Sequence, residues 1–150
     1  ENKTIEQAKD DIKEAIKIAE NFAKEQGLNN MQCVWNDFAQ GDVYLNLAPV
    51  KDEIVLYPDL IKVKVALDDG EILGMEAQGY LNSHTVRDFK EPKIDVNEAR
   101  KLVNKDVEIL SERLALIPTD WSTEILAYEF RLLKSNTRTT ARAVQKQNHF

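Results

Sequence analysis

Apolar and polar residues alternate along two neighbouring stretches within residues 57–80, on either side of the acidic turn Asp68-Asp69-Gly70. Strict alternation around a Gly-containing turn predicts a β-hairpin. Strand side chains point to opposite faces in turn, so Lys62 and Lys64 lie on the face opposite their aliphatic neighbours. The pattern therefore predicts one buried face and one face open to water.

Two registers fit this hairpin. A two-residue Asp69-Gly70 loop places Val65 opposite Gly74, whereas a three-residue loop ends in a left-handed Gly70. The second register pairs Val65 with Leu73, Val63 with Met75 and Ile61 with Ala77. A slip of one residue would turn the apolar set out to water, so the pattern favours the second register, a type I turn followed by a Gly bulge.

A long amphipathic helix is predicted near the start of the chain. Thr4 and Gln7 have the spacing of a capping box, and Gly27 is a typical helix stop. Apolar residues follow the cap at spacings of three and four, which forms one stripe. These residues are Ile5, Ala8, Ile12, Ala15, Ile16, Ala19, Phe22 and Ala23.

Strand-like segments lie between this helix and the hairpin. Residues 31–38 and 43–48 alternate around a turn at 39–42, and residues 54–57 form a short apolar run. Residues 81–90 are polar with little periodicity, and Glu91-Pro92-Lys93 is typical of a linker. The first part of the chain is therefore a helix followed by antiparallel strands.

The same order then repeats. Asp95 caps a second, shorter helix, Ile94 can pack on Ala99 as a hydrophobic staple, and residues 113–117 and 124–130 suit a second hairpin around 118–120. We predict an α+β protein of two modules, residues 1–90 and 91–150, each a helix packed on an antiparallel sheet.

Composition narrows the class of protein. The chain has 150 residues and a net charge of −6, which argues against nucleic acid as the main partner. No apolar run approaches the ~20 residues that span a bilayer. The first residue is Glu1, so we expect a fragment or a processed form, whose membrane contact would come only through an anchor upstream.

The charge is unevenly distributed. Residues 130–150 contain five basic residues and no acidic one, so the rest of the chain carries −11. The basic residues are Arg131, Lys134, Arg138, Arg142 and Lys146. This segment shows no strand alternation, which leaves its structure and its origin as open questions.

Few residues suggest catalytic or metal chemistry. Asp68, Asp69 and Glu71 do not have the spacing of a calcium loop, and acidic hairpin turns are common. Ser83 and His84 are adjacent, but a nucleophile and its base are assembled in space and not by sequence neighbours. We expect no catalytic, cofactor or metal site.

The remaining candidates suit packing better than chemistry. His149 lies beside the C-terminus, so a histidine-built metal site is not expected. Cys33 alternates with Met31 and Trp35, as in a half-buried strand, where cysteine acts as a small hydrophobe. Trp35 is expected to pack in the core or at an edge, while Trp121, in a polar turn, could meet a partner.

The hairpin and the segments after it resemble the PepSY modules of the YpeB family of spore germination proteins. The resemblance is carried by residues 59–80, by Lys93-Ile94 with Glu98-Ala99-Arg100, and by residues 113–118 and 124–130. It covers roughly residues 4–131 and is most specific in the two hairpins.

The resemblance implies a non-enzymatic accessory protein located outside the cytoplasm, at the spore inner membrane or cortex. Its partner would be a cortex-lytic peptidoglycan hydrolase of the SleB type, which it binds, stabilises or restrains. No catalytic residue and no cofactor carries over, and the partner-binding residues are unknown. The alternative is a PepSY-type peptidase inhibitor or propeptide-like chaperone; a hydrolase built on Ser83 and His84 is a third hypothesis.

The segment after Phe130 departs from the family pattern, which expects another strand pair there. Without those strands the second module would have an open sheet edge that must be covered or paired. We therefore predict either a helix over that edge, formed by residues 131–150, or a homodimer in which the edge pairs with a second chain.

Overall fold

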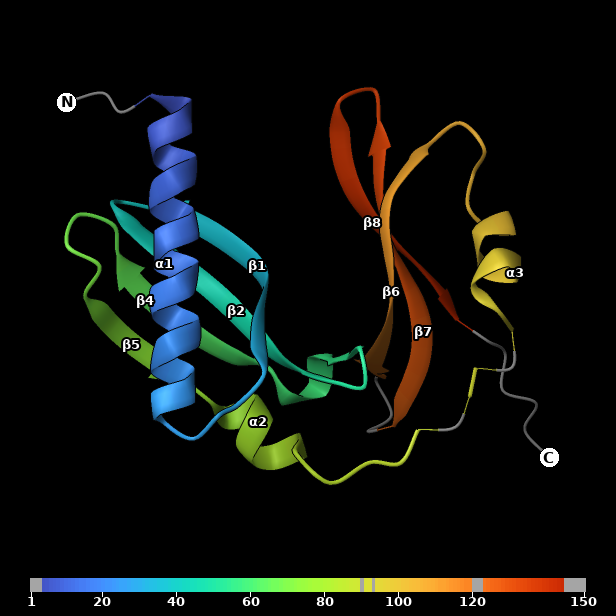
Figure 1. The fold of residues 1–150 in the computed structure, drawn as a ribbon, viewed down its shortest axis with the longest axis horizontal. Helices are drawn as coiled ribbons and strands as arrows, with labels where there is room; N and C mark the ends of the chain where they lie inside the picture. The colour runs from blue at the N-terminus through green and yellow to red at the C-terminus, as the bar shows by residue number, and fades with distance from the viewer. Residues whose placement is uncertain (1–3, 90, 93, 120–122, 145–150) are drawn as a thin grey trace. The chain divides into compact units, whose positions relative to one another are not determined.

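The computed structural model describes residues 4–89, 91–92, 94–119 and 123–144 (Figure 1). Its contacts divide the chain into two compact units. The first unit contains Glu1–Lys51 and Asp59–His84, and the second contains Asp52–Pro58 and Thr85–Phe150. The short segment 52–58 therefore belongs with residues much later in the chain. The division into modules at residues 1–90 and 91–150 stays a prediction about the repeat.

The first helix, α1 (Ile5–Glu25), forms as predicted. The Gln7 amide donates to Thr4 Oγ1 at 3.2 Å, and the Thr4 amide donates to Gln7 Oε1 at 3.0 Å, which completes the capping box. At the other end Gly27 adopts φ 86° and the Leu28 amide donates to the Ala23 carbonyl at 2.9 Å. This is the Schellman arrangement that ends a helix at glycine.

The first unit places α1 on one face of four antiparallel strands in the order β1-β2-β4-β5 (Figure 1). The strands are β1 (Met31–Ala39), β2 (Asp42–Lys51), β4 (Ile61–Ala66) and β5 (Ile72–Glu76). The core between helix and sheet consists of Ala15, Ala19, Ala23, Met31, Val43, Leu45, Leu47, Ile61, Val63 and Val65. Each aliphatic side chain of this kind contributes about 1.5–3 kcal/mol when it is fully buried.

The hairpin of β4 and β5 confirms one of its three predicted pairs. Val63 pairs with Met75, and Gly70 is left-handed at φ 73°, but Val65 pairs with Ile72 and not with Leu73. The pair Ile61–Ala77 does not form, because Ala77 is already the N-cap of the short helix α2 (Gln78–Ser83). The sequence did not predict α2.

The predicted turn of this hairpin is wrong by one residue. The Ala66 amide donates to the Glu71 carbonyl at 2.9 Å, so the turn encloses residues 67–70. One extra residue in the turn would move the side chains of β5 to the opposite faces of the sheet. A bulge at Leu73 compensates, since Val65 pairs with Ile72 and the register is restored from Gly74 onward.

The second unit has its own sheet, in the order β3-β6-β7-β8. The strands are β3 (Ile54–Leu56), β6 (Glu108–Pro118), β7 (Glu124–Lys134) and β8 (Thr137–Val144). The pairing of β3 with β6 is parallel and the other pairings are antiparallel. The predicted hairpin near Pro118 is thereby confirmed, and the two units together confirm the predicted α+β class.

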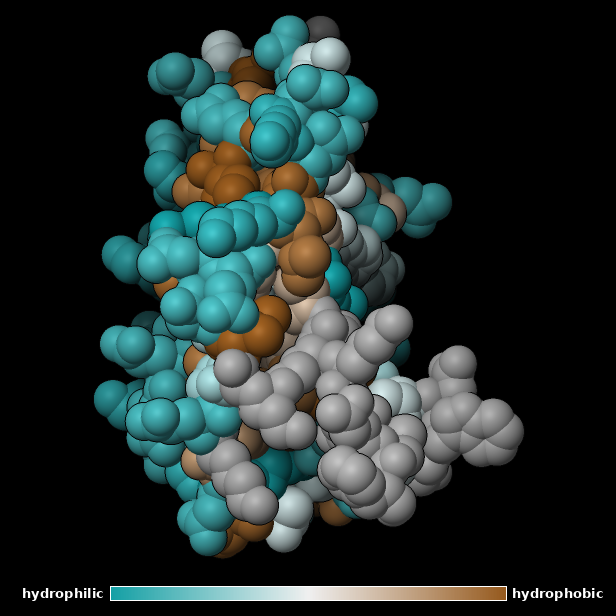
Figure 2. Space-filling view, turned by 90° about the vertical axis from the view of Figure 1, so that its right-hand side faces the viewer, coloured by the Kyte–Doolittle hydropathy of each residue, from teal (hydrophilic) through white to brown (hydrophobic). Residues whose placement is uncertain are grey.

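The helix α3 (Val96–Lys101) packs on the second sheet through Ala99, which contacts Phe130 and Leu132. The Asp95 side chain caps it by accepting from the Glu98 amide at 2.8 Å. Six residues of helix cover little of the sheet. Figure 2 shows apolar surface between the polar side chains on the α3 side of the molecule.

An extended segment completes the cover of this sheet. Phe89 packs against Ile54, Leu56 and Leu116. Arg87 donates from Nε and Nη2 to the Glu124 carboxylate at 2.9 and 2.8 Å, a bidentate ion pair that holds the segment on the sheet.

The predicted helix over residues 131–150 is wrong over the described part of that segment, whereas the alternative, a homodimer through an open sheet edge, stays a prediction. β7 continues to Lys134, and β8 pairs with it from Ala127 to Lys134, so a strand lies where the covering helix was predicted. Ser135 and Asn136 have φ of 48° and 66°, both left-handed, as a tight two-residue hairpin turn requires. Ala141 and Ala143 join the core beside Phe130 and Tyr128, which is the alternation that the arginines obscured.

Glu129 lies on the other face of β7 and is 2% exposed. It accepts from the Tyr57 hydroxyl at 2.8 Å, from Arg113 Nε at 3.1 Å and from Arg142 Nε at 3.1 Å. Tyr57 begins the 3-10 helix η1 (Tyr57–Asp59), so this carboxylate ties β6, β7 and β8 to the end of β3. Burial alone would raise the pKa of Glu129, but these hydrogen bonds and the charge of Arg113 lower it below its ordinary value.

The turn before β8 gives a test of the hairpin. Replacing Asn136 by alanine should lower the free energy of unfolding by about 1 kcal/mol, since alanine is strained at a left-handed φ, whereas Asn136→Gly should be neutral or stabilising. Chemical unfolding of the two variants measures the difference. An alanine variant at least as stable as the glycine variant would contradict the turn.

The Glu129 cluster predicts a pH-dependent loss of stability. Glu129→Gln should cost about 2–4 kcal/mol near neutral pH, because it leaves two arginines without their shared carboxylate. The lowered pKa means that the wild-type contribution is present above the ordinary value of 4.5 and is lost as the pH falls through the depressed value.

The difference between wild type and Glu129→Gln should therefore shrink in acid. Unfolding by urea at neutral and acidic pH measures it. Glu112→Gln is the matched control, since Glu112 also pairs with an arginine, Arg100, but at a solvated position, and should cost less. Equal losses for the two variants, or a loss independent of pH, would contradict the assignment.

Candidate binding face

A β-bulge in β1 turns Trp35 to the outside of the first sheet. Cys33 pairs with Leu47, but Trp35 pairs with Asn46, so Val34 is an extra residue in the strand. Without the bulge Trp35 would share the core-facing side with Cys33, as strict alternation predicts. Of the two places expected for Trp35, core or edge, the core is wrong: its side chain lies on the outer strand β1, opposite Asn46, and is 50% exposed.

The strand register arranges the outer face in two rows that cross all four strands. The first row is Trp35, Asn46, Lys62 and Glu76, and the second is Asp37, Tyr44, Lys64 and Gly74. Each row contains one aromatic ring on β1 or β2 and one lysine on β4. We call this surface the outer face.

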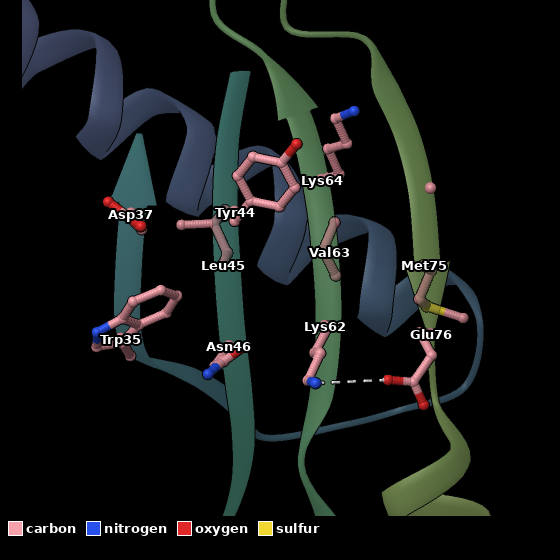
Figure 3. Close-up of a pocket in the computed structure, with 11 residues that line it drawn as sticks. Trp35, Asp37, Tyr44, Leu45, Asn46, Lys62, Val63, Lys64, Met75 and Glu76 are labelled. Carbon is pink, nitrogen blue, oxygen red and sulfur yellow. Dashed lines mark ion pairs between the residues drawn. The ribbon is translucent and has the colours of Figure 1, made fainter. Parts of the chain in front are cut away.

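The outer face forms an open groove of about 640 Å³ on the side of the sheet away from α1 (Figure 3). The rings of Trp35 and Tyr44 lie at the β1–β2 side, and Lys62 on β4 is joined to Glu76 on β5. The Lys64 ammonium lies near Asp42 and Tyr44 of β2. Gly74 ends the second row in open space, because a Cβ there would have no neighbour within 4 Å. The groove is therefore unobstructed at its β5 end, beside Gly74.

The charges of the outer face are largely paired with one another. Lys62 Nζ lies 4.0 Å from the Glu76 carboxylate, and Lys64 Nζ lies 3.4 Å from that of Asp42. Lys64 also stands 5.3 Å from the centre of the Tyr44 ring. The Tyr44 hydroxyl, followed by Asp42, holds the pKa of Lys64 above its ordinary value.

Two polar groups on this face have unused hydrogen-bonding capacity. Within the described part of the chain neither the Asn46 amide nor the Trp35 indole N–H forms a side-chain hydrogen bond. An amide offers two donors and an acceptor, and an indole offers one donor. Both groups lie in the first row, and one of them belongs to the exposed ring of Trp35.

The strand edges of this unit are exposed as well. β5 lies at one end of the strand order and pairs only with β4 among the described strands. Its Leu73 and Met75 side chains are 46% and 39% exposed. Natural edge strands are more often protected by lysine or proline, so this apolar edge is suited to pairing with another chain.

The structure gives local, structural roles to the acidic turn residues. Asp69 Oδ1 accepts from the Glu71 amide at 2.9 Å, which stabilises the hairpin turn. Across the residues that the structure describes, no group of three or more His, Cys, Asp or Glu side chains is placed to hold a metal ion.

His84 is engaged in an arrangement that the sequence did not suggest. Its Nδ1 lies 2.8 Å from the carboxylate of Asp59, which is fully buried, and its ring stacks on Tyr80 with centroids 4.3 Å apart. This pair fastens the end of α2 to the start of β4. Residues 25 apart show no sequence pattern that would have linked them.

The other candidates are partly accounted for. Cys33 is half-buried, its amide donates to Glu20 Oε1 at 3.0 Å, and its thiol approaches the Trp35 carbonyl at 3.3 Å. Trp121 and His149 lie outside the described residues. None of the described helices is long and apolar enough to cross a membrane.

Known proteins resemble this chain over most of its length. The family model described as YpeB sporulation, PepSY1 and PepSY2 domains matches residues 1–90. Sporulation protein YpeB of Halalkalibacterium halodurans is 39% identical over 119 residues, 79% of this chain and 27% of the relative. Its counterpart in Bacillus subtilis is 34% identical over 131 residues, 86% of this chain and 29% of the relative.

The fold is also found in a solved structure. The C-terminal domain of Bacillus megaterium YpeB has a TM-score of 0.76 and 24% sequence identity, over 89% of this chain and 65% of that one. This likeness concerns the fold. The chain spans less than a third of the length of the curated relatives it matches. The resemblance carried by the hairpins is confirmed, and the chain belongs to the YpeB family of sporulation proteins.

Proposed function

We propose that this chain is a non-enzymatic binding module in spore germination, which binds and restrains or stabilises a cortex-lytic peptidoglycan hydrolase of the SleB type. Membership of the YpeB sporulation family supports the germination role. The position of the module would be extracytoplasmic, at the spore inner membrane or cortex. Any anchor would lie elsewhere in the longer protein.

The exposed edge of β5 is the observation that carries the proposal. An edge strand presents unpaired backbone groups, to which an extended segment of a partner can add as a further strand. The exposed Leu73 and Met75 side chains supply apolar contacts beside these hydrogen bonds. Gly74 between them leaves space for a side chain of the partner.

His84, the most reactive candidate, pairs through Nδ1 with a buried carboxylate, a pairing that also orients the imidazole of a hydrolase triad, so the pair itself does not argue against catalysis. In a hydrolase built on Ser83 and His84, the imidazole would have to serve a nucleophile at a site open to substrate. Here the His84 ring is stacked on Tyr80, and its Nδ1 faces the buried Asp59. The pair is thus suited to positioning α2.

Calorimetry with a purified SleB-type hydrolase tests the proposal. The wild-type chain should bind, and replacing both Leu73 and Met75 by lysine should weaken binding about tenfold or more, because charge on an edge strand opposes strand addition. Leu110→Lys is the matched control, since Leu110 is also an exposed leucine on a strand but lies on β6. It should bind like the wild type.

Two results would overturn the proposal. One is the absence of binding to any cortex hydrolase, and the other is equal binding by the double-lysine variant. Inhibition of a secreted metalloprotease or a subtilisin in a parallel assay would favour the alternative, a PepSY-type peptidase inhibitor.

A further inference from the structure

We propose that the outer face of the first unit is a binding site for a neutral oligosaccharide of N-acetylated amino sugars. The site adjoins the β5 edge that carries the proposed protein contact, because Gly74, Met75 and Glu76 of β5 also line its groove. The argument starts from the two aromatic rings and continues through charge, hydrogen-bonding capacity and backbone geometry.

The exposed ring of Trp35 suits the face of a sugar ring, and Tyr44, over whose ring Lys64 stands, lies beside it. Trp35 is 50% and Tyr44 is 41% exposed, and both lie on the outer face beside an open groove (Figure 3). The C–H groups on the face of a pyranose carry partial positive charge, and the face of an aromatic ring is negative, so the two stack. Positions two apart along neighbouring strands are about 7–8 Å apart, which lets one extended ligand meet both rings.

The charge of the face favours a neutral ligand. Lys62 is paired with Glu76, and Lys64 is paired with Asp42 and stands over the Tyr44 ring. The two rows carry two lysines and two carboxylates, Asp37 and Glu76, so a charged ligand of either sign would meet like charges. A neutral ligand rich in hydroxyl groups can instead hydrogen-bond to the paired groups while they remain in place.

The acetamido group is suggested by Asn46. Its amide has no partner among the described residues, and it can donate to an acetamido carbonyl while accepting from the acetamido N–H. Trp35 lies directly opposite Asn46, where the indole can cover the acetyl methyl group. Its indole N–H is a further free donor for a ring hydroxyl.

The bulge at Val34 is independent support for a binding role. It leaves a large apolar side chain 50% exposed, which gives up part of the about 1.5–3 kcal/mol that full burial contributes, although the sequence alternation would otherwise bury it. β-bulges are found beside binding sites, where they re-aim side chains. Contact of Trp35 with a ligand would restore the burial that the bulge gives up.

Titration of the whole chain with chitotetraose, the tetramer of N-acetylglucosamine, tests this proposal by calorimetry and by amide chemical shifts. Binding should shift the signals of the two rows. Trp35→Ala should weaken it about tenfold or more. Phe38→Ala is the matched control, because Phe38 is 53% exposed on the same strand but pairs with the core residue Val43, and it should bind like the wild type.

A separate comparison tests whether the site recognises the acetamido group. Cellotetraose, which lacks the acetamido group, should bind at least several-fold more weakly, and Asn46→Asp, which removes the amide donors, should abolish this preference. Equal affinity for the two sugars would overturn the assignment.

The proposal as a whole would be overturned by the absence of chitotetraose binding, or by binding that Trp35→Ala leaves unchanged. If Trp35→Ala instead weakens hydrolase binding and no sugar binds, the outer face is a protein contact. Leu73 does not line the groove, so hydrolase binding that is lost in Leu73→Lys while sugar binding persists separates the two proposals.

Discussion

The packing of α1 against the first sheet is the interaction on which the outer face depends. Ala15, Ala19 and Ala23 point at the sheet and are buried, and their small side chains let the helix come close to Val63 and Val65. Because side chains alternate along a strand, this contact commits every second residue of β2 and β4 to water. The polar rows of the outer face therefore follow from the packing of the apolar residues against α1 on the opposite face of the sheet.

Two β-bulges then decide what those rows contain. The bulge at Val34 moves Trp35 out of the core side of β1, and the bulge at Leu73 keeps Gly74 and Glu76 in line with the lysines of β4. Both lie on outer strands, where one unpaired residue disturbs fewer ladder hydrogen bonds. The aromatic end of the groove and its open end therefore follow from one extra residue in each strand.

The second unit is organised around a buried carboxylate. Glu129 is hydrogen-bonded from three directions, by Tyr57 next to β3, Arg113 on β6 and Arg142 on β8. Two arginines and a tyrosine outweigh the desolvation of one carboxylate, which is why burial does not raise its pKa. Arg142, one of the five basic residues after Phe130, belongs to the last strand and pairs with Glu129 on the strand beside it.

Local patterns determined the elements, and long-range contacts determined the site. The cap and stop of α1, the alternation of β4 and the two hairpins were readable because each depends on residues a few positions apart. The placement of Trp35, the pairing of His84 with Asp59 and the role of β8 were not, because they depend on bulges and on partners remote in sequence. The alternation of apolar and polar residues predicts which face of the sheet a side chain lies on only while the strands pair regularly. A single unpaired residue moves every later side chain of its strand to the opposite face.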